Sequence, residues 1–156
     1  MQKQLDHEKL DVYRIELDFI AWATDLMVEL SESPSAKTRR ISETFDHLDR
    51  ASLSSLFNTA EGNGKRQMKT RAKFFDDARG SATECAACLD ALVAKRACEE
   101  PRVEQGKALL VRVVSILTKL VDRFSHPTQV REVPMRYAIE DEDEDEDEDE
   151  KSMQSH

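Results

Sequence analysis

Two cysteines stand at a spacing that could bind a metal or carry out redox chemistry. Cys85 and Cys88 form a C-x-x-C, which is the spacing of zinc knuckles and of thioredoxin-like redox sites. A zinc site needs a second ligand pair at similar spacing, and a thioredoxin-like site follows a β-strand. Neither context surrounds these cysteines, so we expect both to be small residues of a helical core, with no metal and no cofactor.

An arginine and a histidine form a second candidate pair. Arg40 and His47 match the Arg-x6-His spacing of some helical ribonucleases, in which the pair assists phosphodiester cleavage. No histidine belongs to a Glu-x-x-His pair of the kind that di-iron bundles require, and the sequence contains no phosphate loop, H-E-x-x-H or nucleophile elbow. We therefore expect no enzymatic activity. A solvated helix surface is the simpler interpretation of Arg40 and His47, and a ribonuclease is the remote alternative.

The clearest charge feature lies between Gly62 and Phe75, a segment with no acidic residue. Its five basic residues are Lys65, Arg66, Lys69, Arg71 and Lys73. The three lysines are four residues apart and are predicted to share one face near the start of a helix, where cations oppose the macrodipole. This arrangement favours an anionic partner, and the five residues are predicted to contact the phosphates of RNA or DNA. A lysine-rich face that serves only solubility is the alternative.

The elements that must position these residues are predicted from the apolar spacing. Steps of three and four predict helices at about Leu5–Ser31, Ala36–Glu61 and Gln67–Arg96, and a fourth that opens at Glu100 and Pro101 and extends to Phe124. The Gly62–Gly64 segment is predicted to end the second helix with a positive φ. Short connections between long helices predict an all-α, up-down-up-down four-helix bundle.

The first predicted helix carries more apolar residues than one helix–helix contact requires. Its first stripe contains Val12, Ile15, Phe19, Trp22, Leu26 and Leu30, and a second stripe contains Leu10, Tyr13, Leu17, Ile20 and Met27. A broad apolar face suggests a second partner surface.

Acidic residues are concentrated at the end of the sequence. The formal net charge is −9, but the run from Glu140 to Glu150 contains eleven carboxylates, and residues 1–139 have 22 basic and 21 acidic side chains. We predict a bundle at 1–126, a linker at 127–139 and a disordered acidic tail at 140–156. No apolar run exceeds five residues, and the start has no signal-peptide pattern, so we expect a cytoplasmic protein without membrane contact.

Specific polar and small residues give the sequence a family resemblance over about residues 8–124. They are Leu10, Val12 and Tyr13, then Asn58, Ala60, Glu61, Gly62 and Gly64, and then Phe74, Phe75, Ala78, Gly80, Ser81 and Glu84. With these residues the sequence resembles the four-helix bundle family named after 23S rRNA intervening-sequence proteins. It departs from the family pattern at Leu56, where a Pro is common, and at Gln67, where Ser or Thr usually caps the third helix.

The resemblance implies the same four-helix bundle and a ring-like homopentamer; the molecular function of the family is not established. A more distant likeness in fold links it to the basic pentamers that accompany the reverse transcriptase of diversity-generating retroelements. The matched region also contains Arg50, Asn58, Glu61 and Glu84, which we expect to form a hydrogen-bonded cluster that holds the Gly62–Gly64 turn. A surface pocket of the assembled ring is the alternative role of these four residues.

These observations lead to one main hypothesis and one alternative. The main hypothesis is a non-enzymatic, oligomeric bundle that acts as a scaffold or adaptor and binds nucleic acid through a ring of basic residues. The alternative is a protein–protein interaction module whose acidic tail recruits a basic protein.

Overall fold

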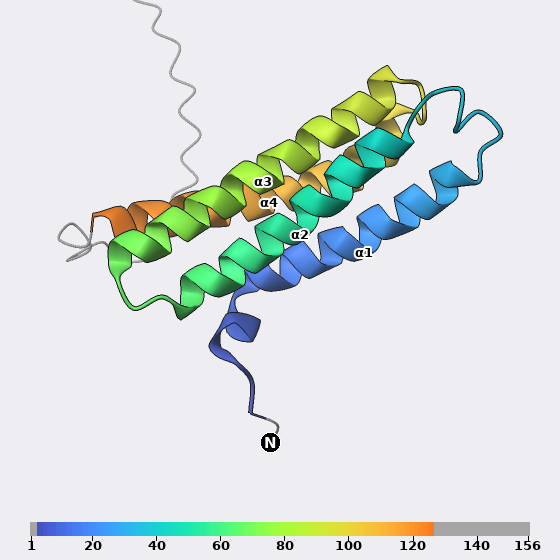
Figure 1. Ribbon diagram of the computed structural model, residues 1–156. Helices are drawn as coiled ribbons and strands as arrows, with labels where there is room; N and C mark the ends of the chain where they lie inside the picture. Colours follow the sequence, from blue (N-terminus) through green and yellow to red (C-terminus); the bar gives the residue numbers. More distant parts are fainter. Residues whose placement is uncertain (1–2, 127–156) are drawn as a thin grey trace, which may run out of the picture.

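Four antiparallel α-helices make up the bundle (Figure 1). A computed structural model of the chain describes residues 3–126, and the predicted linker and acidic tail lie outside this range. The helices are α1 (Asp11–Ser31), α2 (Ser42–Gly64), α3 (Met68–Ala94) and α4 (Glu100–Ser125), and the short 3-10 helix η1 (Asp6–Lys9) precedes them. Helices that follow one another in the sequence pack against each other, and α1 also packs against α4. The predicted up-down-up-down bundle is confirmed.

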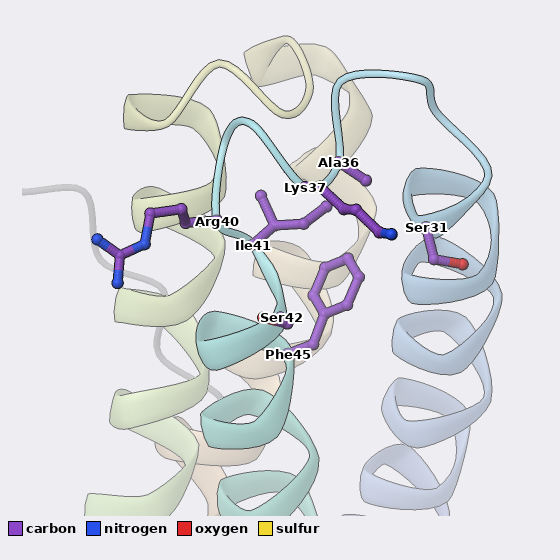
Figure 2. Close-up of a pocket in the computed structure, with 7 residues that line it drawn as sticks. All are labelled: Ser31, Ala36, Lys37, Arg40, Ile41, Ser42 and Phe45. Atoms are coloured by element: carbon purple, nitrogen blue, oxygen red, sulfur yellow. The ribbon is translucent and has the colours of Figure 1, made fainter.

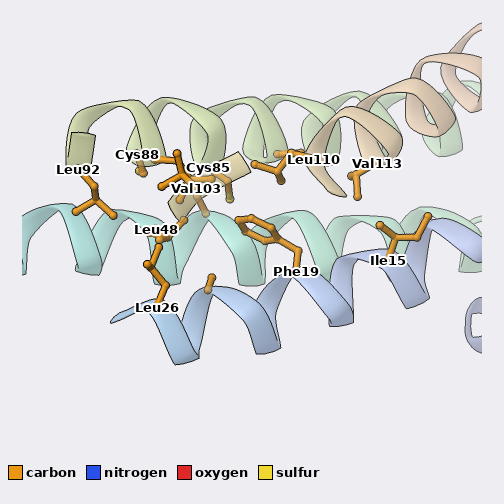
Figure 3. Close-up of a cluster of buried hydrophobic side chains, with 14 of the residues drawn as sticks. Ile15, Phe19, Leu26, Leu48, Cys85, Cys88, Leu92, Val103, Leu110 and Val113 are labelled. Carbon is orange, nitrogen blue, oxygen red and sulfur yellow. The ribbon is translucent and has the colours of Figure 1, made fainter. Parts of the chain in front are cut away.

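The core follows the apolar stripes of the sequence. Residues from all four helices point into the space between them, among them Phe19, Leu48, Leu92 and Val113 (Figure 3). Small side chains on α3 let its neighbours approach closely, since Ala78 and Ala82 are completely buried. No helix within residues 3–126 is long and apolar enough to cross a membrane.

Two of the predicted helix starts are wrong. The chain is extended at Leu10, so η1 and α1 replace one continuous helix from Leu5. The backbone N–H of Leu5 donates to the Glu8 carboxylate at 2.5 Å, which closes a short separate turn. The second helix begins at Ser42 rather than Ala36, because residues 36–40 form turns that carry the chain across the end of the bundle.

The turn between α2 and α3 also differs from the prediction. Helix α2 continues through Gly64, and no glycine within residues 3–126 has a positive φ. Gly62 is required instead by close packing, because a Cβ there would lie 2.9 Å from the Cβ of Phe74. The left-handed backbone positions belong to Arg40 and Arg96, with φ values of 51° and 58°.

Candidate nucleic-acid interface

The predicted basic residues lie at the end of the bundle where α2 passes into α3 and where α4 ends (Figure 1). Arg71 organises the turn between α2 and α3. Its Nε donates to the backbone carbonyl of Lys65 at 2.5 Å, and its Nη2 donates to that of Asn63 at 2.8 Å. These two bonds satisfy carbonyl groups at the C-terminus of α2, which would otherwise lack partners. Arg71 therefore fixes the turn that carries the other cations.

Phe74, on the first half of α3, is flanked by two lysine ammonium groups. The Nζ atoms of Lys65 and Lys73 lie 5.0 and 5.6 Å from the centre of its ring. Such cation–π contacts contribute about 0.5–1 kcal/mol each at exposed sites. The ring thus holds two cations close together despite their mutual repulsion.

Phe124, in the last turn of α4, is flanked in the same way by two guanidinium groups. The Cζ atoms of Arg71 and Arg123 lie 5.3 and 5.6 Å from its ring centre. Its ring also packs against that of Phe75, with 5.8 Å between centroids. Helix α4 thereby adds an aromatic ring and a sixth basic side chain, Arg123, to the surface formed by the α2–α3 turn.

We call this surface the cation–aromatic end. Its members are Lys65, Arg66, Lys69, Arg71, Lys73, Phe74, Arg123 and Phe124. Cations held close together on aromatic rings suit a ligand with several negative charges, such as the phosphates of a nucleic acid.

The five predicted basic residues differ in how far they are already paired. Lys65 forms an ion pair with Glu61 at 3.3 Å, and Lys73 forms one with Asp77 at 3.0 Å. Arg71 donates its hydrogen bonds to backbone carbonyls of the α2–α3 turn. Arg66 and Lys69 are exposed and make no ion pair or side-chain hydrogen bond within residues 3–126. These two residues are therefore the most available to an anionic ligand.

The predicted common face of the three lysines is not formed. Lys65 is the residue that follows α2, whereas Lys69 lies in the first turn of α3 and Lys73 in the second. Lys65 and Lys73 approach each other through Phe74 rather than through helical spacing.

The four residues predicted to form a polar cluster are not brought together. Asn58 donates to the carbonyl of Ser54, Glu61 pairs with Lys65, and the carboxylate of Glu84 lies 3.6 Å from Nδ1 of His47. No hydrogen bond or ion pair within the described range joins any two of Arg50, Asn58, Glu61 and Glu84. Glu61 and Glu84 thus contact Lys65 and His47 instead of each other. The hydrogen bonds that hold the turn come from Arg71.

Cys85 and Cys88 are core residues, as predicted. Both side chains lie among the apolar side chains of the core (Figure 3), and their exposed fractions are 0% and 7%. Burial raises the pKa of both thiols, that of Cys85 to about 12. A thiol that stays protonated is a poor nucleophile and a poor metal ligand. Residues 3–126 contain no group of three His, Cys, Asp or Glu side chains arranged to hold a metal ion.

Arg40 and His47 lie near the opposite end of the bundle. Arg40 lines a pocket of about 280 Å³ with Lys37, Ile41 and Phe45, but its guanidinium points away from Phe45 (Figure 2). His47 faces α3, where it meets the carboxylate of Glu84. No hydrogen bond or ion pair within the described residues joins His47 to Arg40.

A buried carboxylate was missed by the sequence analysis. Glu16 of α1 is only 3% exposed, and it accepts a hydrogen bond of 2.6 Å from Ser55 Oγ of α2. Its Oε1 atom and the hydroxyl of Thr59 have no hydrogen-bond partner within the described residues. Burial raises the pKa of Glu16 to about 7, and the nearby hydroxyls only partly oppose this shift. The sequence contained a sign of this site, because Glu16 lies four residues after Val12 on the core-facing stripe.

The outward face of α1 is apolar over much of its length. Leu17 and Val28 are 42% and 55% exposed, and Ala21 and Thr24 lie between them on the same side. Tyr13, Ile20 and Met27 of the predicted second stripe are half-buried beside them. The apolar surface of α1 is therefore wider than the part covered by α2 and α4. We call Leu17, Ala21, Thr24 and Val28 the outer face of α1.

Comparison with known families agrees with the architecture. The family described as 23S rRNA-intervening sequence protein matches residues 8–119, which begin at η1 and end in the last part of α4. Searches of curated proteins and of solved structures gave no match. Since the matched range covers well over half of the 156 residues and the bundle is the one that the resemblance implies, the chain belongs to the 23S rRNA-intervening sequence protein family.

Proposed function

We propose that this protein is a non-enzymatic, oligomeric scaffold or adaptor that binds nucleic acid through its cation–aromatic end. The observation that carries the proposal is the pairing of four cations on two rings, with Lys65 and Lys73 on Phe74 and Arg71 and Arg123 on Phe124. The family description names 23S rRNA, so RNA is tested beside DNA.

Binding through phosphates is the mode that this arrangement favours. Exposed lysine and arginine side chains neutralise phosphates without reading the base sequence, and the affinity then falls steeply as salt is added. Lys65, Lys73 and Arg71 have internal partners and are partly ordered before binding, which lowers the entropic cost of fixing them. Arg66 and Lys69 supply positive charge that no acidic side chain within residues 3–126 pairs with.

Site-directed variants test the nucleic-acid proposal directly. The site variant is Arg66→Gln with Lys69→Gln, and the control is Lys37→Gln with Arg96→Gln at the opposite end of the bundle. Each variant removes one arginine and one lysine from exposed positions without a side-chain partner in the described range. Anisotropy of labelled 20-nucleotide RNA and DNA at low salt is expected to show at least a tenfold weaker Kd for the site variant only. Equal losses in both variants would contradict a localised site.

We propose self-association through the outer face of α1 as the basis of the scaffold. An exposed apolar strip on a helix that faces away from its own core is a common feature of oligomer interfaces. Repetition of the cation–aromatic end around such an assembly, with a pentamer as the expected state, would bring several weak phosphate sites together and raise their combined affinity.

Light scattering tests the assembly independently of nucleic acid. The unmodified chain is expected to have a mass several times its 17.8 kDa at micromolar concentration. Leu17→Asp with Val28→Asp is expected to reduce the mass to that of a monomer, whereas the control Val111→Asp, on α4 and 65% exposed, should leave it unchanged. A monomeric unmodified chain would exclude this assembly.

The partial pairing of the basic residues favours one alternative function. If Arg66 and Lys69 only maintain solubility, the protein is a protein–protein module, and its acidic segment recruits a basic partner. In that case the unmodified chain would fail to bind either oligonucleotide at low salt.

A further inference from the structure

The described chain ends beside the cation–aromatic end. Helix α4 ends at Ser125, at the same end of the bundle as the turn between α2 and α3 (Figure 1). The residue before it, Phe124, contacts both Arg71 and Phe75. Whatever follows α4 in the sequence therefore starts next to the basic surface. The other end of the bundle lies about 35–40 Å away, because a helix of this length rises about 1.5 Å per residue.

The sequence after α4 carries a charge opposite to that of this surface. Eleven consecutive carboxylates occupy positions 140–150, and residues 127–139 separate them from the described residues. Between Gly62 and Phe75 there are five basic residues and no acidic one, and the last turns of α4 add Lys119 and Arg123 against Asp122. An intervening segment of this length can span at most about 45 Å.

Distance and charge together select the nearer basic surface. Lys37, Arg39, Arg40, Lys95 and Arg96 provide a second group of cations at the far end of the bundle. The first carboxylates of the acidic run could reach that group only if the intervening segment were almost fully stretched, and the later ones only if the run itself were also extended along the bundle, both of which cost chain entropy. The cation–aromatic end needs no such extension, and a short tether gives an effective concentration near the millimolar range there.

We propose that residues 140–150 dock on the cation–aromatic end and compete with nucleic acid for it. The carboxylates take the place of phosphates at Arg66 and Lys69 and at the cations held on Phe74 and Phe124. This contact weakens as salt rises, since exposed charges are screened over about 8–10 Å at ordinary ionic strength. The docking rests on the geometry and charge of this surface; only the competition rests on the proposed nucleic-acid function.

A full-length variant with an uncharged tail tests the docking without nucleic acid. In this neutral-tail variant every Glu and Asp from 140 to 150 is replaced by Gln or Asn. A labelled peptide of residues 140–150 is titrated with the neutral-tail variant and with the unmodified chain at low salt, and its anisotropy is measured. The peptide is expected to bind the neutral-tail variant at least about tenfold more tightly, because the native segment occupies the surface in the unmodified chain. Equal affinities would overturn the docking.

Substitutions in the neutral-tail background locate the contact. Arg66→Gln with Lys69→Gln is expected to weaken peptide binding about tenfold or more, while the control Lys37→Gln with Arg96→Gln changes it less than twofold. The opposite pattern would overturn the proposed location.

Nucleic-acid binding then separates the two proposals. If the neutral-tail variant binds RNA or DNA at least about fivefold more tightly than the unmodified chain at low salt, competition is supported. If the peptide docks but neither protein binds nucleic acid, the proposed function fails and the docking stands. If both proteins bind nucleic acid equally, the competition is wrong, whatever the peptide does.

Discussion

Glu16 of α1 accepts a hydrogen bond from Ser55 of α2 at 2.6 Å, in the buried space between the two helices. One of its carboxylate oxygens has no partner within the described residues, and neither has the neighbouring hydroxyl of Thr59. A charged carboxylate is costly in such a place, whereas a protonated one can donate a hydrogen bond of its own.

Ionisation of Glu16 is therefore expected to destabilise the bundle as pH rises. Its pKa is about 7 in the folded protein against 4.5 for the ordinary group. The folded state binds the proton more tightly, so the free energy of unfolding falls between about pH 4.5 and 7 and then levels off. The loss is on the order of 2–4 kcal/mol. Among the described residues, no charged group contributes to this shift of the Glu16 pKa. Cys85 of α3, the titratable neighbour that Glu16 affects, stays neutral because its own pKa is about 12.

The pH effect is measured by urea unfolding at pH 5 and pH 8. Glu16→Gln keeps an acceptor for Ser55 and removes the titration, so its stability should change much less between the two pH values. Glu104→Gln, at an exposed carboxylate of α4 that makes no ion pair within residues 3–126, serves as the control and should retain the dependence of the unmodified chain. A Glu16→Gln protein with the same pH dependence as the unmodified chain would refute the assignment.

Gly106 of α4 is expected to tolerate no larger residue. Its position lies against the ring of Trp22 on α1, and an added Cβ would overlap that ring. Gly106→Ala should lower the free energy of unfolding by about 1–3 kcal/mol, through overpacking between α1 and α4. Gly80→Ala is the matched control, because Gly80 lies within α3 with nothing within 4 Å of a Cβ. It should stabilise by about 0.5–1 kcal/mol through helix propensity. Thermal unfolding of both variants checks the contrast.

Arg96 is expected to destabilise the end of α3 through its backbone conformation. Its φ is 58°, and the N–H of Ala97 donates to the carbonyl of Leu92 at 2.9 Å, which is the hydrogen bond of a Schellman cap. Glycine adopts this conformation without the Cβ clash, so Arg96→Gly should raise the free energy of unfolding by about 0.5–1 kcal/mol. Lys95→Gly, one residue earlier with a helical φ of −75°, should lower it. Equal effects of the two changes in chemical denaturation would argue against the cap.

Cys85 and Cys88 are expected to matter through packing alone. Changing both to Ala should preserve the circular dichroism spectrum and cost about 1–3 kcal/mol in the free energy of unfolding, because two buried sulfur atoms are lost. Cys98→Ala, at a half-buried position, should cost less. The packing role would be contradicted if the purified protein contained stoichiometric zinc and if this zinc were lost when Cys85 and Cys88 are both changed to Ala.

The helices could be predicted from the sequence because the apolar residues of each follow one helical stripe from end to end. The residues at which the helices begin and end could not be predicted in this way, since they depend on contacts between helices. Residues 36–40 read as a helix start, yet the chain must cross the end of the bundle there and bring Ile41 into the core. Gly62 was predicted to be a helix cap with a positive φ, but a glycine is needed there because Phe74 packs too closely for a larger residue.

The candidate site was only partly predictable for a similar reason. A run of basic residues is visible in the sequence, so Arg66 and Lys69 were found. Phe124 and Arg123 were missed because they lie about fifty residues away from Arg71, and only the packing of α4 on α3 brings them together. The predicted polar cluster failed because family-specific residues do not reveal which neighbours they pair with.

The salt dependence of RNA binding tests the central claim most directly. The association constant of a labelled single-stranded RNA is measured between about 50 and 200 mM salt for the neutral-tail variant, with and without Arg66→Gln and Lys69→Gln. If the cation–aromatic end binds phosphates, the slope of log K against log salt should become shallower by about two when both cations are removed. Lys37→Gln with Arg96→Gln should leave the slope unchanged. Identical slopes in all three proteins would contradict the claim that this end of the bundle is the nucleic-acid interface.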